Sequence, residues 1–228
     1  MGQTRFWGIF SLMLSSNARA SRFGRAKHGL GAMTLAVLTL GCSAETKPGA
    51  SQSLPSVWVG AVQDTEVKVA LVDRNGAVEL FFCGGPDSYA TKTRWFAEGA
   101  LRADRFSFMS GGWTVEGVVR EGGASGSVQT ASDAPADWTA EVADSATIAG
   151  LYEGSAPCGK LGLIVTQPRA DDEPTGQGAC LQVEGERVTV EQVNPVRLTR
   201  SAQSEISVTV ASAPNERFTV RPVTNVGQ

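Results

Sequence analysis

Glu66-Val-Lys-Val-Ala-Leu-Val-Asp-Arg-Asn-Gly-Ala-Val-Glu-Leu-Phe-Phe-Cys83 is the stretch that decides the fold. Two alternating apolar runs flank Asn75-Gly76. This is the strongest short-range signal for a β-hairpin, because both central residues of the favoured turn need positive φ. A two-residue turn also fixes the register, so that Leu71 faces Leu80. One face of the hairpin then carries apolar residues alone: Val67, Val69, Leu71, Val78, Leu80 and Phe82. The opposite face is mixed, with Lys68, Ala70, Val72, Glu79, Phe81 and Cys83.

Short alternating runs of the same kind continue at spacings of about 8 to 12 residues, and no window has the apolar spacing of a capped helix. Short connections favour pairing between neighbours. The sequence therefore predicts an antiparallel up-and-down meander that closes into a small barrel, with a two-sheet sandwich as the alternative. Glycines in or beside the runs suit the bends of a tightly coiled sheet; these are Gly60, Gly99, Gly117 and Gly126. The expected strands are residues 57–63, 66–74, 77–83, 93–101, 105–109, 113–120, 124–130 and 137–142.

A second group of expected strands follows this meander, which we place at residues 57–152. These strands cover residues 161–166, 180–183, 187–193, 206–210 and 218–220. The C-terminal hairpins, within residues 153–228, either form a second small β unit or pack on and continue the first, and the sequence does not choose between the two. Both arrangements are all-β.

The N-terminal part has the composition of an export signal. Four positive charges lie between Arg19 and Lys27 without an acid, and a short apolar run, Leu30–Leu40, ends at Gly41-Cys42. A basic segment, an apolar core of about ten residues and a small residue at the cleavage point are the three parts of such a signal. The run is shorter than the roughly 20 residues of a membrane-spanning helix. We therefore expect residues 1–41 to be a signal peptide.

Leu38-Thr-Leu-Gly-Cys42 resembles the lipobox of bacterial lipoproteins. In that family the cysteine thiol takes a diacylglycerol and cleavage leaves an acylated N-terminus, so the resemblance implies a membrane anchor at Cys42. Ser43 would suit delivery to an outer membrane in an organism that has one. Residues 42–56 are small and polar and are interrupted by prolines, which is the composition of a tether. The alternative is an ordinary cleaved signal peptide, in which Cys42 carries no lipid.

Loss of the leader changes the composition of the mature chain. Of the 20 Lys and Arg residues five precede Cys42, so 15 remain against 23 Asp and Glu residues, a net charge of −8. Such a surface repels phosphates, and we expect no nucleic-acid partner. His28, the one histidine of the sequence, also precedes Cys42. A mature chain without histidine cannot build a Ser-His-Asp or Cys-His catalytic site or a His-ligated metal site, and we expect no metal or cofactor.

Three cysteines remain for the folded part, an odd number for an exported protein. A disulfide between Cys158 and Cys180 would close a short loop and stabilise the fold by roughly 3 kcal/mol in the chain-entropy model. A bridge from Cys83 to either of them would instead hold the C-terminal part against the mixed face of the hairpin. Three free thiols are the third alternative. A nucleophilic role is not expected, since no histidine can activate a thiol.

A succession of patterns from Val59-Gly60 through Trp95-Phe96 to Ala149-Gly-Leu-Tyr152 is similar to a β domain that recurs, uncharacterised, in bacterial exported proteins. The resemblance covers residues 57–180. It rests on the positions of strands and turns, so it implies the fold alone and carries no activity.

Tryptophans are the residues with the clearest binding chemistry. Aromatic side chains on strands can line a barrel that holds one small molecule, which makes Trp58, Trp95 and Trp113 candidate ligand-lining residues; the alternative is that they fill the core. No group of residues has the pattern of a catalytic site. We therefore favour a lipid-anchored cell-envelope domain with a non-enzymatic binding or structural role, whose partner is an envelope protein or a wall component. The alternatives are a carrier of a small apolar ligand and a histidine-free hydrolase that uses carboxylates or a Ser–Lys pair.

Overall fold

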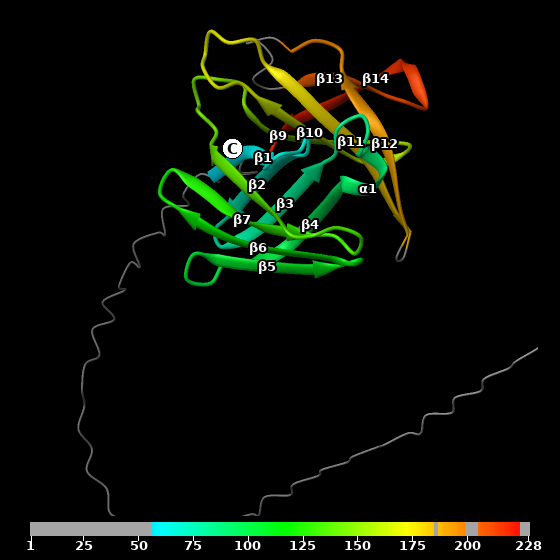
Figure 1. Ribbon diagram of the computed structural model, residues 1–228. Coiled ribbons are helices and arrows are strands. Elements are labelled where there is room, and N and C mark those ends of the chain that lie inside the picture. The colour runs from blue at the N-terminus through cyan, green and yellow to red at the C-terminus, as the bar shows by residue number, and fades with distance from the viewer. Residues whose placement is uncertain (1–55, 185–186, 199–204, 224–228) are drawn as a thin grey trace, which may run out of the picture. The chain divides into compact units, whose positions relative to one another are not determined.

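The computed structural model describes residues 56–223 apart from 185–186 and 199–204, and all of these belong to one compact unit. Strands make up most of this part of the chain, which also has one four-residue helix, α1 (Tyr89–Lys92). The strands form two antiparallel sheets, the first from the cyan and green segments of Figure 1 and the second from the yellow to red ones. The all-β prediction is confirmed.

The first sheet is an eight-stranded meander in the order β4-β3-β2-β1-β8-β7-β6-β5. Strands that are neighbours along the chain pair, except that β4 and β5 do not; β1 also pairs with β8, so β4 and β5 are the two edges. In the connection between these edges an isolated bridge joins Arg102 to Arg105. Across the gap the ring centroids of Phe96 and Phe108 are 5.2 Å apart. The sheet is thus a nearly closed barrel, as predicted, and not a sandwich. Its strands are β1 (Ser56–Val62), β2 (Lys68–Arg74), β3 (Ala77–Cys83), β4 (Arg94–Ala100), β5 (Arg105–Ser110), β6 (Trp113–Arg120), β7 (Gly123–Gln129) and β8 (Ala136–Val142).

The hairpin of β2 and β3 has the predicted register. Val69 lies opposite Phe82. The turn residues Asn75 and Gly76 have φ of 58° and 89°, the positive values that an Asn-Gly turn supplies. The Gly76 amide donates a hydrogen bond of 2.6 Å to Oδ1 of Asp73, which fixes the turn further.

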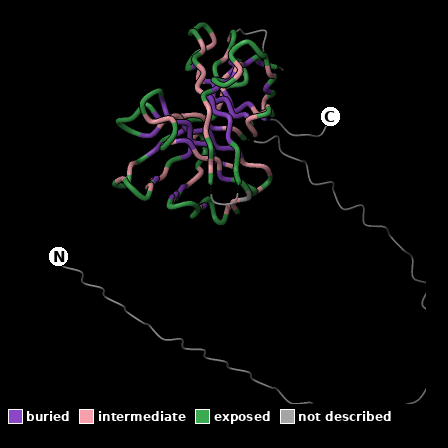
Figure 2. The backbone as a smooth tube through the Cα atoms, turned by 90° about the vertical axis from the view of Figure 1, so that its right-hand side faces the viewer, coloured by how far each residue is buried: buried purple, intermediate pink, exposed green. Residues whose placement is uncertain are grey.

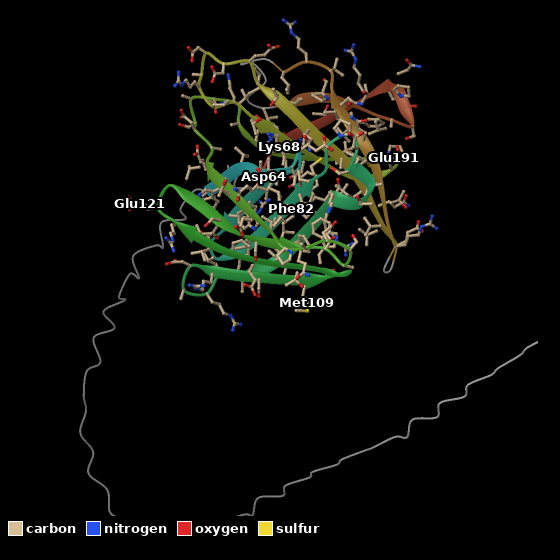
Figure 3. All side chains as sticks on the ribbon, in the orientation of Figure 1. Asp64, Lys68, Phe82, Met109, Glu121 and Glu191 are labelled. Carbon is tan, nitrogen blue, oxygen red and sulfur yellow. A yellow bond between two sulfur atoms is a disulfide. The ribbon has the colours of Figure 1, made fainter. Side chains whose placement is uncertain are left out.

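Aromatic side chains fill the interior of the first sheet. Phe82, labelled in Figure 3, has its ring centroid 5.8 Å from that of Trp113 and 6.4 Å from that of Trp138. A Cβ at Gly117 would overlap the ring of Phe106, so this glycine leaves the space that the ring occupies. The buried core of the sheet includes Trp58, Val69, Leu71, Val78, Leu80, Phe82, Phe96, Phe106, Trp113, Val115 and Trp138.

The second sheet is a closed six-stranded barrel in the order β10-β11-β12-β13-β14-β9. Leu151 and Tyr152, expected at the end of the meander, belong to its first strand. The core is mainly aliphatic and includes Ile148, Leu161, Leu163, Val165, Val193, Ile206, Val208, Val210 and Val220. The strands are β9 (Gly150–Ala156), β10 (Gly159–Thr166), β11 (Thr175–Glu184), β12 (Arg187–Pro195), β13 (Ile206–Val210) and β14 (Ala213–Pro222).

One disulfide cross-links the second barrel. Cys158, in the turn between β9 and β10, is bonded to Cys180 of β11, with the two Cα atoms 6.1 Å apart. This confirms the first of the pairings that the sequence left open. Cys83 is a buried free thiol, so the alternative of a bridge from Cys83 is wrong.

The second barrel covers the mixed face of the β2–β3 hairpin. Trp95 of β4 takes part in this contact, because a Cβ at Gly162 of β10 would overlap its ring. The ammonium group of Lys160 lies 3.6 Å from the centroid of the same ring. Figure 2 shows the buried backbone running through this region of the molecule. The shared apolar cluster consists of Ala70, Val72, Phe81 and Cys83 from the first sheet with Leu151, Ile164, Ala179, Leu181 and Val223. The two sheets are thus held together by apolar contact, and not by the disulfide from Cys83 that was one alternative.

Candidate functional site

A pocket of about 240 Å³ opens at one end of the first sheet. The β1–β2 turn, α1, the start of β6 and the β7–β8 loop surround it, so it occupies the mouth of the nearly closed barrel, a common place for a ligand site. Its volume lies below the roughly 300–1,000 Å³ of sites for drug-sized molecules, which limits it to a small ligand. The apolar part of the wall consists of Val62, Val67, Phe82, Trp113, Val128, Ala134 and Ala136.

Trp113 is placed at this mouth by a tight turn. Gly111 and Gly112 have φ of 57° and 79°, a left-handed conformation that glycine adopts without strain, and they reverse the chain between β5 and β6. Trp113 is then the first residue of β6, and 8% of its surface is exposed. The ring therefore belongs to the core on one side and to the pocket wall on the other.

Three polar side chains form the lip of the pocket. Lys92 of α1 is ion-paired with Asp133 of the β7–β8 loop, and the hydroxyl of Thr130 donates a hydrogen bond to the same carboxylate. The hydrogen bonds from Lys92 and then Thr130 lower the pKa of Asp133. The carboxylate consequently stays charged at neutral pH, and an ionic lip borders an apolar cavity. Such a site suits a ligand with an apolar body and one polar end.

The three candidate ligand-lining tryptophans have different positions. Trp113 borders the mouth pocket, whereas Trp58 is 5% exposed within the core of the first sheet. Trp95 lies outside that core, against the second barrel, where its ring centroid is 4.7 Å from that of Phe81. The structure therefore brings one of the three to a pocket and places the other two in packing roles. Cys42 lies outside the described residues.

The sequence did not predict the three polar side chains at the lip of the pocket. Thr130 and Asp133 belong to a short polar segment between two strands, which reads as an ordinary turn. Lys92 lies in a helix of one turn that no periodicity could reveal. The pairing of Lys92 with Asp133 depends on the β1–β8 contact, which brings the end of β7 round to the end of β3. A polar loop of this kind becomes informative only once its place at the barrel mouth is known.

Cys83 is the described thiol that could react. It is fully buried, and burial raises its pKa to about 12, although hydrogen bonds from Thr93 and Gln177 act in the opposite direction. A thiol with such a pKa is protonated at neutral pH, and the thiolate is the nucleophilic form. Cys83 is therefore a packing residue under these conditions.

Within the described ranges, no three His, Cys, Asp or Glu side chains lie close enough together to hold a metal ion. The helix that this part of the chain contains is too short to cross a lipid bilayer. Comparisons with protein-family models, curated proteins and solved structures gave no match. The function of the chain is therefore inferred from its own residues.

Proposed function

We propose that this chain is a lipid-anchored cell-envelope protein whose β body binds a small apolar ligand and has no catalytic role. The export signal and the lipobox-like sequence ending at Cys42 support the anchor, and residues 42–56 supply the tether. In this proposal the body stands clear of the membrane surface. A net charge of −8 on the mature chain, from 15 bases against 23 acids, supports the same view because it disfavours anionic lipid and nucleic acid as partners.

The mouth pocket is the observation that carries the binding role. A cavity of about 240 Å³ with walls from Trp113 and Phe82 remains at the end of a barrel that is otherwise filled by aromatic rings. Its position and lining are those of a small-molecule site. The ion pair of Lys92 with Asp133 would accept the polar end of a ligand that enters from solvent. These features favour the small-ligand alternative over a purely structural role.

Two features support binding without catalysis. The one histidine, His28, precedes Cys42 and is absent from the proposed mature chain. Cys83, the free thiol of the described part, is buried with its pKa raised to about 12. The proposed mature body therefore has neither a histidine that could act as a base nor a free thiol of lowered pKa, the two usual ways to activate a nucleophile.

Ligand titration of the full chain tests the pocket. Monocyclic arenes and medium-chain alcohols should change the tryptophan fluorescence saturably, because Trp113 forms part of the wall. We expect Kd values of about 0.1–1 mM, as a ligand of this size can gain only about 4–6 kcal/mol. The substitution Ala136→Leu fills part of the cavity and should weaken binding at least tenfold.

Ala77→Leu is the matched control, since Ala77 lies at the exposed start of β3, at the opposite end of the sheet. It should leave the affinity unchanged. Equal affinities for the wild type and Ala136→Leu, or no saturable response to any ligand of the panel, would refute the pocket as the functional site.

Palmitate labelling of cells that express the chain tests the anchor. The wild type should incorporate label and sediment with membranes, whereas Cys42→Ser should do neither. A mature protein whose mass shows residues preceding Cys42, or an unmodified Cys42, would contradict the anchor and leave the pocket proposal standing.

A further inference from the structure

A groove of about 980 Å³ lies on the first sheet and shares no lining residue with the mouth pocket. Its floor is the sheet of β5, β6, β7 and β8, of which the first three run side by side in Figure 1. Cross-strand pairing aligns one side chain from each of these strands in a single row. The row consists of Ser107, Glu116, Ser127 and Asp137. Their neighbours Phe106, Val115, Val128 and Trp138 belong to the core, so the row faces outward.

A second row runs beside the first. Register places Arg105, Val118, Ser125 and Thr139 across the same four strands. Gln63 and Arg102 extend the lining at its two ends. A Cβ at Gly126 would overlap the carbonyl oxygen of Glu116, so the sheet bends sharply between the rows, where glycine alone fits.

The polar side chains of the groove have no partners within the described part of the chain. No hydrogen bond or ion pair involves the side chain of Glu116, Asp137 or Arg105 there, nor those of the serines and threonine of the two rows. The lip of the mouth pocket is the opposite case, because its carboxylate already accepts bonds from Lys92 and Thr130. The groove therefore offers a full set of open donors and acceptors to a ligand.

Charge limits the chemical class of that ligand. The lining has two guanidinium groups, on Arg102 and Arg105, and two carboxylates, on Glu116 and Asp137. An anion or a cation would each meet as many like charges as opposite ones. A neutral molecule rich in hydroxyl groups meets no such penalty, because a hydroxyl donates to carboxylates and accepts from guanidinium, amide and hydroxyl groups.

Spacing limits its shape. Each row crosses the strands, so its side chains recur at the strand separation of about 4.7–4.9 Å. This separation is comparable to the advance per sugar along an extended β-linked glycan. The geometry points to a neutral, extended, β-1,4-linked glycan as the ligand of this groove, lying across β5–β8 with about one sugar per strand. The inference is independent of the mouth pocket, and it extends the binding role of the body to a polysaccharide.

Titration calorimetry of the full chain with soluble tetrasaccharides tests this inference. Cellotetraose and chitotetraose are the neutral β-1,4-linked probes, maltotetraose is a coiled α-1,4-linked control, and a galacturonic acid tetramer is an anionic control. We expect the two β-linked probes to bind with submillimolar Kd and the two controls to bind at least tenfold more weakly.

Variants then locate the site. The double substitution Glu116→Ala with Asp137→Ala should weaken glycan binding at least tenfold, and Ser127→Trp should block it sterically. Glu121→Ala removes a similar charge from the exposed β6–β7 turn, labelled in Figure 3, and should bind like the wild type. Thermal melts identify any variant that fails to fold, and the exposed position of Glu116 and Asp137 predicts melting temperatures near that of the wild type.

Several results would overturn the inference. These are absence of binding by the β-linked probes, equal binding of maltotetraose, preference for the anionic tetramer, and a double variant that folds and binds like the wild type. None of these results affects the arene and alcohol titration, so the glycan proposal and the mouth-pocket proposal can be refuted independently.

Discussion

The interiors of the two sheets are filled by different kinds of side chain. The interior of a β-barrel widens with strand number, so eight strands enclose more space than six. In the eight-stranded sheet, rings such as Phe82, Trp113 and Trp138 fill that space. In the six-stranded barrel, branched aliphatic side chains such as Leu163 and Ile206 suffice. The wider sheet fills its centre and keeps a pocket at its end, whereas the narrower barrel closes completely and is cross-linked by a disulfide.

The comparison assigns different roles to the two sheets. Both proposed ligand sites lie on the first sheet, one at its mouth and one on its outer face. The second barrel covers the mixed face of the β2–β3 hairpin and so buries Phe81 and Cys83. The second barrel thus supports the first sheet through β2 and β3, next to the β4 edge.

The largest expected effect comes from removing a ring at the centre of the first sheet. Phe82→Ala should cost about 3–5 kcal/mol of unfolding free energy, because Phe82 is fully buried and contacts other rings. The matched change in the second barrel, Leu163→Ala, should cost about 2–5 kcal/mol. Urea unfolding followed by tryptophan fluorescence reports the first sheet, which contains the four described tryptophans, and circular dichroism reports both sheets.

Because the two sheets share an apolar interface, we expect the two probes to give coincident transitions for both variants. Separate transitions would mean that the two sheets fold independently. A loss of less than about 1 kcal/mol in Phe82→Ala would contradict the view that aromatic rings fill the wider barrel.

The next largest effect comes from the disulfide between Cys158 and Cys180, which cross-links the second barrel. Replacing Cys158 and Cys180 together by alanine should lower the free energy of unfolding by about 3 kcal/mol, since the bond closes a loop across a sequence separation of 22. Differential scanning calorimetry with and without a thiol reductant measures it. Reductant should lower the melting temperature of the wild type and leave that of the double variant unchanged. A wild type that is insensitive to complete reduction would show that barrel closure alone stabilises this region.

Local signals in the sequence predicted the β2–β3 hairpin down to its register, because Asn75-Gly76 admits one turn geometry. The same reasoning favoured pairing of β4 with β5, which are joined by a short connection. In the structure β4 and β5 do not pair, and the isolated bridge between Arg102 and Arg105 lies in their connection. The ring of Phe108 packs against Gly99 where such pairing would run. Ring volume in the core overrides loop length at this edge.

The sequence did not predict closure of the second barrel, because closure depends on pairing between strands that are far apart in the chain. Closure depends on β14 pairing with β9, with Val220 opposite Gly154, and no local pattern reports such a contact. The register of β10 with β11 places Cys180 opposite Leu161, and it depends on the loop between the two strands. The buried side chain of Gln167 helps to hold this loop, because its amide donates a hydrogen bond to the carbonyl oxygen of Asp172.

A smaller effect should reveal how the two sheets are coupled. The hydroxyl of Tyr89, from α1, shares its one proton between the carbonyl oxygens of Gly178 and Glu191 in the second barrel and accepts a hydrogen bond from the amide of Val193. Burial raises the pKa of this hydroxyl. Tyr89→Phe should cost about 1–3 kcal/mol, because it leaves buried carbonyl groups without a donor. It should also separate the fluorescence and circular dichroism transitions.

Tyr152→Phe is the matched control for that coupling. The hydroxyl of Tyr152 donates to the carbonyl oxygen of Ile148 over 2.9 Å, so its bond lies within the second barrel region. This variant should lose stability with both transitions still coincident. The same separation in both variants would contradict a specific coupling role for Tyr89.

The smallest effect is a pH dependence from Cys83 at the interface of the two sheets. Burial raises its pKa to about 12, whereas an unfolded cysteine titrates near 8.5. A raised folded-state pKa contributes stability that is complete below the unfolded pKa and is lost as pH rises toward the folded one. At pH 9.5 the wild type should therefore have lost about 1 kcal/mol relative to Cys83→Ala, compared with their difference at pH 7. Urea midpoints of the two proteins at both pH values measure this, and the comparison cancels the titration of tyrosines and lysines. Parallel pH profiles would mean that the interface opens to solvent around Cys83, and the second barrel would then be a looser support for the first sheet than the buried cluster indicates.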